Sequence, residues 1–381
     1  MRFKSFQEDW KKERIGDYIN EVKFYTSNFE EYPLFTFSIE NGVTPKTDRY
    51  ERGFLVKKEG DTFKVIQKNQ FLMNPMNLRF GAINYSKIEK PVSVSGYYDI
   101  FEIEKKKNND FWHGLLSNNK ALKMYNSIST GSLIEKKRVH FSQLINMKLY
   151  LPSFPEREKI SLFLALINQR IEAQNKIIEK LESLKIGLKE RIFLSGKDKE
   201  SFAKILHEKT EKSTMQNQYP VLSSTVKGLF LQSEYFDRSV ASENNIGYKI
   251  VKKGQIIISP QNLWMGNLTI NEKYDNGIVS PSYKIYEIDK AYSKKYIYWL
   301  LTSKRSFFNY SLVSEQGASI VRRNLNFDAF MELWLPVIKD VNTQQKIDKL
   351  IDSIEKKIDS EKKRGALLNK QKSFLLSNLF I

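Results

Sequence analysis

The sequence repeats itself at a separation of about 186 residues, and this repeat restricts the chain to a duplicated architecture. Residues 63–78 (FKVIQKNQFLMNPMNL) align with residues 248–263 (YKIVKKGQIIISPQNL), with six identities and apolar types at most other places. Further matches keep the same order, namely Gly81 with Gly266, Val94-Ser95 with Val279-Ser280, Leu115-Leu116 with Leu300-Leu301, and Tyr125 with Tyr310. The sequence therefore indicates a tandem duplication.

The first 150 or so residues of each copy have the composition of a mixed α+β domain. Short runs rich in Val, Ile, Tyr and Phe alternate with Gly, Pro and Asn turns, as in strands. The predicted strands include 63–66, 71–73, 93–104, 248–251, 255–259 and 282–288, and the predicted helical segments are 115–125 and 292–310.

The last 40 or so residues of each copy follow a heptad pattern. The seam positions of the first copy are Ile160, Leu164, Ile167, Ile171, Gln174, Ile178, Leu181, Lys185, Leu188 and Ile192. Those of the second copy are Ile347, Ile351, Ile354, Ile358, Glu361, Gly365, Leu368, Lys372, Leu375 and Leu379. Fifteen of the twenty are apolar and the intervening residues are mostly charged or amide, which favours a coiled coil. Two amphipathic helices that each pack only on their own domain are the alternative.

Chain connectivity sets the direction of the predicted pair. The first helix ends where the second domain starts, and the second helix starts where that domain ends, so helices that pair along their length are antiparallel. At about 1.5 Å per residue, 33 residues give a rod of roughly 50 Å. We expect an α+β protein with two duplicated globular domains separated by a long antiparallel two-helix coiled coil, with pseudo-two-fold symmetry.

The polar seam residues predict a register. An antiparallel pair centred midway between positions 174 and 185 places Lys185 opposite Glu361, and Gln174 opposite Lys372. Polar residues in a seam select register, and a buried lysine needs a polar partner. Side chains that point outward at frayed layers are the alternative.

Composition narrows the function. The chain has 62 Lys and Arg against 44 Asp and Glu, a net charge of +18, which favours a polyanionic partner. We find no apolar run of about 18 residues and no signal-peptide pattern, so we expect no membrane partner and a cytoplasmic protein. Cysteine is absent, the three histidines lack ligand spacing, and no phosphate-binding glycine loop or convincing catalytic centre occurs, so we expect no metal site and no catalytic residue.

The segments that open the two heptad regions carry a family resemblance. Residues 151–160 (LPSFPEREKI) resemble the Leu-Pro-x-x-x-Glu-Gln-x-Lys-Ile junction of the specificity subunits of type I restriction–modification systems, with Arg157 where glutamine is usual. In the second copy, Leu335-Pro336 is followed by TQQKI at 343–347, with Gln344 in the glutamate place. The helix ends, Lys185 to Phe193 and Lys372 to Phe380, are also similar to that family. The resemblance covers essentially the whole chain.

This resemblance implies the domains and the partners. Residues 1–152 and 198–336 would be target recognition domains that each read one half of a bipartite duplex DNA target, and residues 153–197 and 337–381 would be spacer helices. Two modification (methyltransferase) subunits would dock on the helices, and restriction (motor-nuclease) subunits would join them. S-adenosylmethionine, ATP and magnesium would be bound by those partners, with no cofactor in this chain, which would be a non-catalytic subunit.

Two features of each copy are candidate DNA contacts. The matched turns 74–81 and 259–266 differ within a shared frame of Pro, Asn and Gly, so Arg79 corresponds to Trp264, and basic residues follow the matched glycines Gly131 and Gly317. The candidates are Asn77, Arg79, Gln261, Asn262 and Trp264 on the turns, and Lys136, Lys137, Arg138, Arg322 and Arg323 after the glycines. A structural turn with incidental variation and a solvated charge run are the alternatives.

Two other classes of protein stay open. A self-contained nuclease or methyltransferase with degenerate motifs would show activity as purified protein. A basic coiled-coil adaptor would fail to bind duplex DNA even with methyltransferase subunits present.

Overall fold

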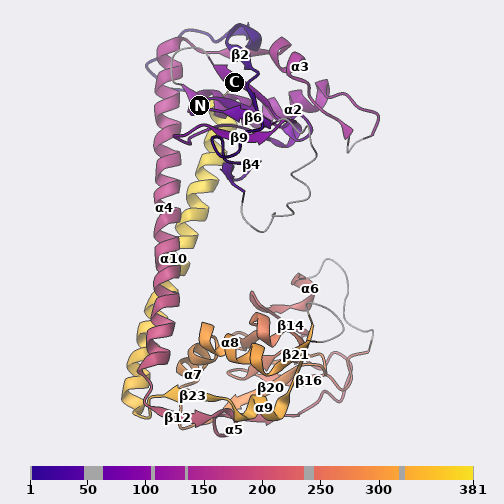
Figure 1. Cartoon of the computed structure of the whole chain (residues 1–381), viewed down its shortest axis with the longest axis vertical. Helices are drawn as coiled ribbons and strands as arrows, with labels where there is room; N and C mark the ends of the chain where they lie inside the picture. The colour runs from indigo at the N-terminus through magenta and orange to yellow at the C-terminus, as the bar shows by residue number, and fades with distance from the viewer. Residues whose placement is uncertain are drawn as a thin grey trace. The chain divides into compact units, whose positions relative to one another are not determined.

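The computed structural model describes residues 2–46, 63–103, 108–133, 136–235, 244–316 and 322–380. The chain forms two compact units, residues 1–175 with 363–381 (unit 1) and residues 176–362 (unit 2). Each unit holds one strand-rich domain and one half of each long helix, α4 (Phe154–Ser195) and α10 (Val341–Leu379) (Figure 1). The predicted mixture of helix and sheet in two domains, with long spacer helices, is confirmed.

The domain of unit 1 is built on a four-stranded antiparallel sheet in the order β2-β10-β7-β8. These strands are β2 (Ile19–Val22), β10 (Asp99–Ile103), β7 (Phe71–Met73) and β8 (Ile83–Tyr85). The other strands are β1 (Lys11–Arg14) with β11 (Lys148–Leu151), β4 (Phe35–Ser38) with β5 (Gly42–Pro45), and β3 (Tyr25–Thr26), β6 (Phe63–Ile66) and β9 (Val92–Ser95) in a three-stranded sheet. The helices are η1 (Ile15–Asp17), η4 (Leu78–Phe80), α1 (Asn109–Ser117), α2 (Asn119–Ile128) and α3 (Phe141–Asn146).

The domain of unit 2 repeats this plan, with a central sheet in the order β13-β20-β17-β18. These strands are β13 (Leu206–Lys209), β20 (Lys284–Ile288), β17 (Ile256–Ile258) and β18 (Leu268–Ile270). The other strand pairs are β12 (Asp198–Ser201) with β23 (Trp334–Val337), β14 (Leu222–Thr225) with β15 (Gly228–Leu231), β16 (Lys249–Lys252) with β19 (Asn276–Val279), and β21 (Ser314–Gln316) with β22 (Arg323–Leu325). The helices are α5 (Phe202–Ile205), α6 (Gln232–Tyr235), η6 (Pro260–Met265), α7 (Lys294–Leu301), α8 (Lys304–Leu312) and α9 (Phe327–Glu332).

Residues that recur identically in both copies make the same contacts. The Lys64 ammonium donates to the carbonyl oxygen of Tyr98 at 2.7 Å, and the matching Lys249 donates to that of Tyr283 at 2.6 Å. These lysines therefore bind backbone carbonyls inside each domain, and their repetition reflects the architecture.

A buried tyrosine is repeated in the same way. The hydroxyl of Tyr125 donates to the carbonyl oxygen of Leu116 at 2.8 Å, and that of Tyr310 donates to the carbonyl oxygen of Leu301 at 2.9 Å. Both tyrosines are fully buried, so each hydroxyl satisfies a helix-end carbonyl that water cannot reach.

Three predicted segments, 93–104, 115–125 and 292–310, are divided in the structure. Residues 93–104, predicted as one strand, form β9 and β10 with a turn between them, in which the Tyr98 N–H donates to the Ser95 carbonyl at 3.1 Å. Residues 115–125 belong to two helices, because Asn118 has an extended backbone and its side chain accepts from the N–H groups of the next helix. Ser303 caps α8 in the same manner in the second copy. Short polar side chains thus end one helix and begin the next.

In each unit the two long helices lie side by side, run in opposite directions and pack on the domain (Figure 1). Ile160 and Leu164 of α4 share the core of unit 1 with Leu375 and Leu379 of α10. None of the twenty seam positions is exposed. Across the described residues, no helix is long and apolar enough to span a bilayer.

Candidate nucleic-acid interface

The first candidate turn follows β7 and is held as a rigid unit. Leu78 is completely buried, and Gly81 closes the turn with φ +95°, a conformation that favours glycine. The Gly81 N–H donates to the Leu78 carbonyl at 2.8 Å, and the Phe80 N–H donates to the Asn77 carbonyl at 2.9 Å. The buried leucine anchors the turn, and side chains on both sides of it reach the surface.

The second candidate turn follows β17 and has the same construction. Leu263 is completely buried, Gly266 has φ +93°, and the Gly266 N–H donates to the Leu263 carbonyl at 2.8 Å. Asn262 is half-buried, and its Oδ1 atom accepts no hydrogen bond from any residue that the structure describes.

The structure brings the basic segment of each domain to the turn. In unit 1 the Val139 N–H donates to the Pro75 carbonyl at 2.9 Å, which fixes Arg138 beside the turn. Lys136 and Arg138 are exposed and Lys137 is half-buried. The sequence predicted the turn and the basic segment as separate features, and here they form one cluster.

In unit 2 the connection is made by side chains. The Arg323 guanidinium of β22 lies 4.1 Å from the centre of the Trp264 ring, a cation–π distance. Arg322, the preceding residue, is exposed, and Gln261 is exposed on the turn. The matched glycine Gly317 lies outside the described residues. We call these two clusters, each a turn with its basic segment, the turn patches.

The turn patches also contain apolar residues that were not among the predicted DNA contacts. Phe80 and Met76 on the first turn are 58% and 46% exposed, and Met265 on the second is 44% exposed. The residues at these positions differ between the two copies, as Arg79 differs from Trp264. This variation is the feature of the sequence that could have identified them as candidate DNA contacts. We chose polar residues as the candidate DNA contacts because base edges are recognised by hydrogen bonds.

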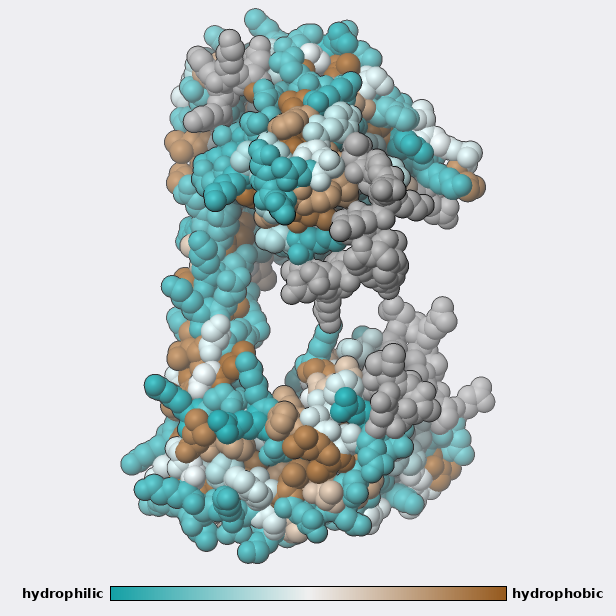
Figure 2. All heavy atoms as spheres, viewed as in Figure 1, coloured by the Kyte–Doolittle hydropathy of each residue, from teal (hydrophilic) through white to brown (hydrophobic). Residues whose placement is uncertain are grey.

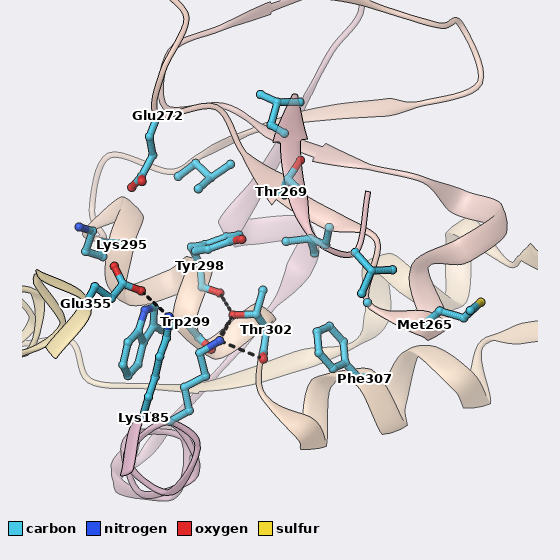
Figure 3. Close-up of a pocket in the computed structure, with 17 residues that line it drawn as sticks. Lys185, Met265, Thr269, Glu272, Lys295, Tyr298, Trp299, Thr302, Phe307 and Glu355 are labelled. Carbon is cyan, nitrogen blue, oxygen red and sulfur yellow. Dashed lines mark hydrogen bonds and ion pairs between the residues drawn. The ribbon is translucent and has the colours of Figure 1, made fainter. Parts of the chain in front are cut away.

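A pocket of about 400 Å³ lies in unit 2 where the domain meets the long helices (Figure 3). Lys189 of α4 donates to the Thr302 hydroxyl at 2.7 Å and lies 5.4 Å from the centre of the Trp299 ring. Burial, and then the charge of Lys185, lowers the pKa of Lys189 to about 8.

Unit 1 has an equivalent pocket of about 340 Å³, lined by residues at matching places in the repeat. Lys372 lines it as Lys185 lines the other, and burial lowers the pKa of Lys372. His113 also lines it, and burial, followed by the charges of Lys372 and Lys87, lowers its pKa to about 4. Asn168 donates to the carboxylate of Asp110 there at 2.7 Å.

The predicted register of the polar seam residues is wrong. The Lys185 ammonium pairs with the Glu355 carboxylate at 2.9 Å and lies 5.8 Å from the centre of the Trp299 ring, instead of pairing with Glu361. Glu361 pairs with Lys357, one turn earlier in its own helix, at 2.7 Å. Lys372 lines the pocket of unit 1 and forms no ion pair with any residue that the structure describes, and its contact with the neutral amide of Gln174 stays a prediction. Lys185 and Lys372 interrupt the seams because each reaches into the pocket beside its domain, where the charge keeps partial contact with water.

The described residues offer no site for a metal. No three His, Asp or Glu side chains among them come together as ligands, and the sequence contains no cysteine. The turn patches instead combine guanidinium, ammonium and amide groups with exposed apolar side chains, which suits contacts to phosphates and bases.

No family model matches the chain. Its fold is similar to that of the S subunit of a type I restriction–modification system from M. genitalium, with a TM-score of 0.55 and 14% identity over 98% of this chain and 96% of that one. A chain from a structure on complex assembly and conformational transition of the type I R-M system has a TM-score of 0.53 and 10% identity over 97% of each chain. At these identities the similarity shows a shared fold over nearly the full length.

Proposed function

We propose that the chain is a non-catalytic DNA-recognition subunit of a type I restriction–modification system. Each domain reads one half of a bipartite duplex target, and the chain holds modification subunits that methylate adenine, with restriction subunits that cleave. S-adenosylmethionine, ATP and magnesium belong to those partners. The proposal is supported by the shared fold, the duplication and the net charge of +18.

One observation carries this proposal. The same rigid turn occurs in both domains with different surface side chains, and each turn is joined to a basic segment. Cationic groups position a protein on phosphates, while variable side chains on a fixed frame discriminate between bases. Two such turns on one chain suit two different half-targets.

The long helices supply the surface for the modification subunits. Helix α4 has exposed Leu162 and Leu166 in unit 1 and exposed Leu184 and Ile186 in unit 2, and apolar side chains appear among hydrophilic ones along the helices in Figure 2. Such side chains on a helix that already has a partner are suited to a further protein contact. Leu166→Glu with Leu184→Glu should weaken co-purification of the modification subunits, whereas glutamate at exposed Met215 in the second domain should not.

The decisive experiment maps methyladenine in the genome with the intact gene, without it, and with residues 1–152 replaced by the corresponding domain of another such subunit. The expected result is a bipartite motif that disappears with the gene and changes in one half only after the replacement. A motif that is unaffected by deletion, or whose two halves change together, would contradict the proposal.

A further inference from the structure

The two turn patches share a composition that simple inheritance does not explain. Four positions differ between the turns. Asn74 corresponds to Ser259 at the start, and at the other three positions each turn carries one aromatic residue, one methionine and one residue that hydrogen-bonds. The first turn has Met76, Arg79 and Phe80 at these places, and the second has Gln261, Trp264 and Met265. The same three kinds of side chain are thus present in a different order.

Each aromatic ring is paired with a guanidinium, and the pairs come from non-equivalent residues. The Arg79 guanidinium lies 4.6 Å from the centre of the Phe80 ring within the first turn. In the second domain Trp264 occupies the place of Arg79, and its cation is Arg323 from β22, at 4.1 Å. Since the two pairs were not copied residue by residue, a requirement common to both domains must maintain them.

The turns hold these rings in a fixed place. The neighbouring leucine of each turn is completely buried, and a left-handed glycine closes each turn. A cation against one face restricts the ring further, while more than half of Phe80 stays exposed. Single exposed apolar residues are common on proteins, but a ring paired with a guanidinium on the matched turn of each domain, beside a basic segment, is a specific arrangement.

We propose that each aromatic–guanidinium pair is a wedge that stacks against an unstacked base step of duplex DNA in its own half-target. This inference rests on the proposed function. Apolar side chains can insert between base steps, and an aromatic ring can stack on any base. The guanidinium and the nearby basic segment neutralise the phosphates of the distorted step.

The wedge gives a second way of reading sequence. Pyrimidine–purine steps unstack more easily than others, so the position that faces each wedge should favour such steps without any hydrogen bond to a base edge. In the second domain Gln261 is exposed on the same turn and is placed to read a neighbouring base edge directly, whereas Arg79 of the first turn is held against its ring.

The test uses the full chain assembled with its modification subunits. The probes are duplexes that contain the bipartite motif found by methyladenine mapping, with 2-aminopurine at one position at a time in each half-target. Unstacking raises 2-aminopurine fluorescence, so we expect a severalfold rise at one step of each half-target. Phe80→Ala should abolish the rise in one half only, Trp264→Ala in the other half only, and each should weaken binding about tenfold. Trp264→Phe, which keeps a ring, should retain the rise.

Matched controls come from the same domains. Tyr150 on β11 and Trp334 on β23 are 47% and 44% exposed, and lysine ammonium groups lie 5.8 and 4.2 Å from the centres of their rings. They are exposed aromatic–cation pairs outside the turn patches, so Tyr150→Ala and Trp334→Ala should leave both fluorescence signals unchanged.

The possible outcomes separate the wedge from the proposed function. Specific binding without any fluorescence rise, or a rise that survives both alanine variants, overturns the wedge and leaves the recognition function intact. If the alanine variants lose the modification subunits but keep the fluorescence signal, the rings contact protein instead of DNA. This outcome also overturns the wedge. A wild-type complex that binds no duplex specifically overturns the proposed function and the wedge together.

Discussion

Lys189 offers a direct test of how the second domain is joined to its helices. Its ammonium donates to the hydroxyl of Thr302 at 2.7 Å and to the carbonyl of the same residue at 3.3 Å, and burial lowers its pKa from 10.5 to about 8. The perturbation is Lys189→Met, which keeps an unbranched chain of similar length and removes the charge.

The structure gives the size and sign of the effect. A pKa displaced from 10.5 to about 8 corresponds to a cost of at most ~3 kcal/mol for holding the charge in the junction. Two hydrogen bonds to Thr302 offset ~2 kcal/mol of this. The free energy of unfolding of the variant should therefore be about 1 kcal/mol higher than that of the wild type at pH 7, so the variant is the more stable of the two.

The pH dependence follows from the lowered pKa of Lys189. Between about pH 8 and 10.5 the unfolded chain holds this proton and the folded chain releases it, so the wild type becomes more stable as the pH rises through that window. Between pH 7.5 and 9.5 the wild type should gain about 2 kcal/mol relative to the variant, and below pH 7.5 the difference should be flat.

The measurement is urea denaturation of the full chain at intervals from pH 6.5 to 9.5, followed by tryptophan fluorescence. Trp264, Trp299 and Trp334 lie in unit 2, so its unfolding contributes strongly to the signal. Lys180→Met removes an exposed charge from the same helix and should show no such pH trend. Parallel stability curves for wild type and Lys189→Met, or a variant less stable by more than 1 kcal/mol at pH 7, would refute the reasoning.

Three further predictions concern the turn glycines, the buried tyrosines and the net charge. Gly81→Ala and Gly266→Ala place a side chain at φ +95° and +93°, so each should cost about 1–2 kcal/mol and weaken recognition of one half-target in duplex binding. Gly187→Ala, whose Cβ would meet no atom within 4 Å in helix α4, should instead stabilise the chain by about 1 kcal/mol without affecting binding. Tyr125→Phe and Tyr310→Phe should each lower the unfolding free energy by about 1–3 kcal/mol, and a double variant measured in urea should show additive losses. The logarithm of the DNA affinity of the assembled complex should fall steeply with the logarithm of salt concentration because of the +18 charge, and a flat plot would contradict the phosphate contacts.

The internal repeat made much of the fold predictable. A residue that recurs at the same place in both copies, such as Lys64 with Lys249 or Tyr125 with Tyr310, satisfies the same backbone carbonyl in each domain. Contacts of this kind depend on geometry that both copies share, so they persist while surfaces diverge. The heptad spacing similarly predicted helices through the seam positions 160–192 and 347–379, which lie within the observed helices Phe154–Ser195 and Val341–Leu379.

The surroundings of the seam lysines were not predictable by the same means. A heptad pattern identifies the positions on the inner side of a helix, but a helix that packs on both a partner and a domain has two inner sides. Lys185 lies at the edge of the seam nearest the domain, so its ammonium reaches Glu355 and the Trp299 ring in the pocket. The candidate DNA contacts posed a related difficulty, because the bond that joins the basic segment to the turn is made by the backbone of Val139 and Pro75.

The pockets where each domain meets the long helices also show how two domains with the same fold become specific for different positions on those helices. In unit 2 the ammonium of Lys295 on α7 pairs with Asp352 on α10, whereas the equivalent residue of α1 in unit 1 is Asp110, which accepts from Asn168 on α4. A copy of the first domain placed in the second position would bring the carboxylate of Asp110 to that of Asp352, and like charges in a half-buried junction repel each other. The charges that fix each domain on its helices are therefore matched to one position only. A chain with two copies of the first domain would need Asp110→Lys in the second copy to restore the pairing, because the shared fold alone does not supply it.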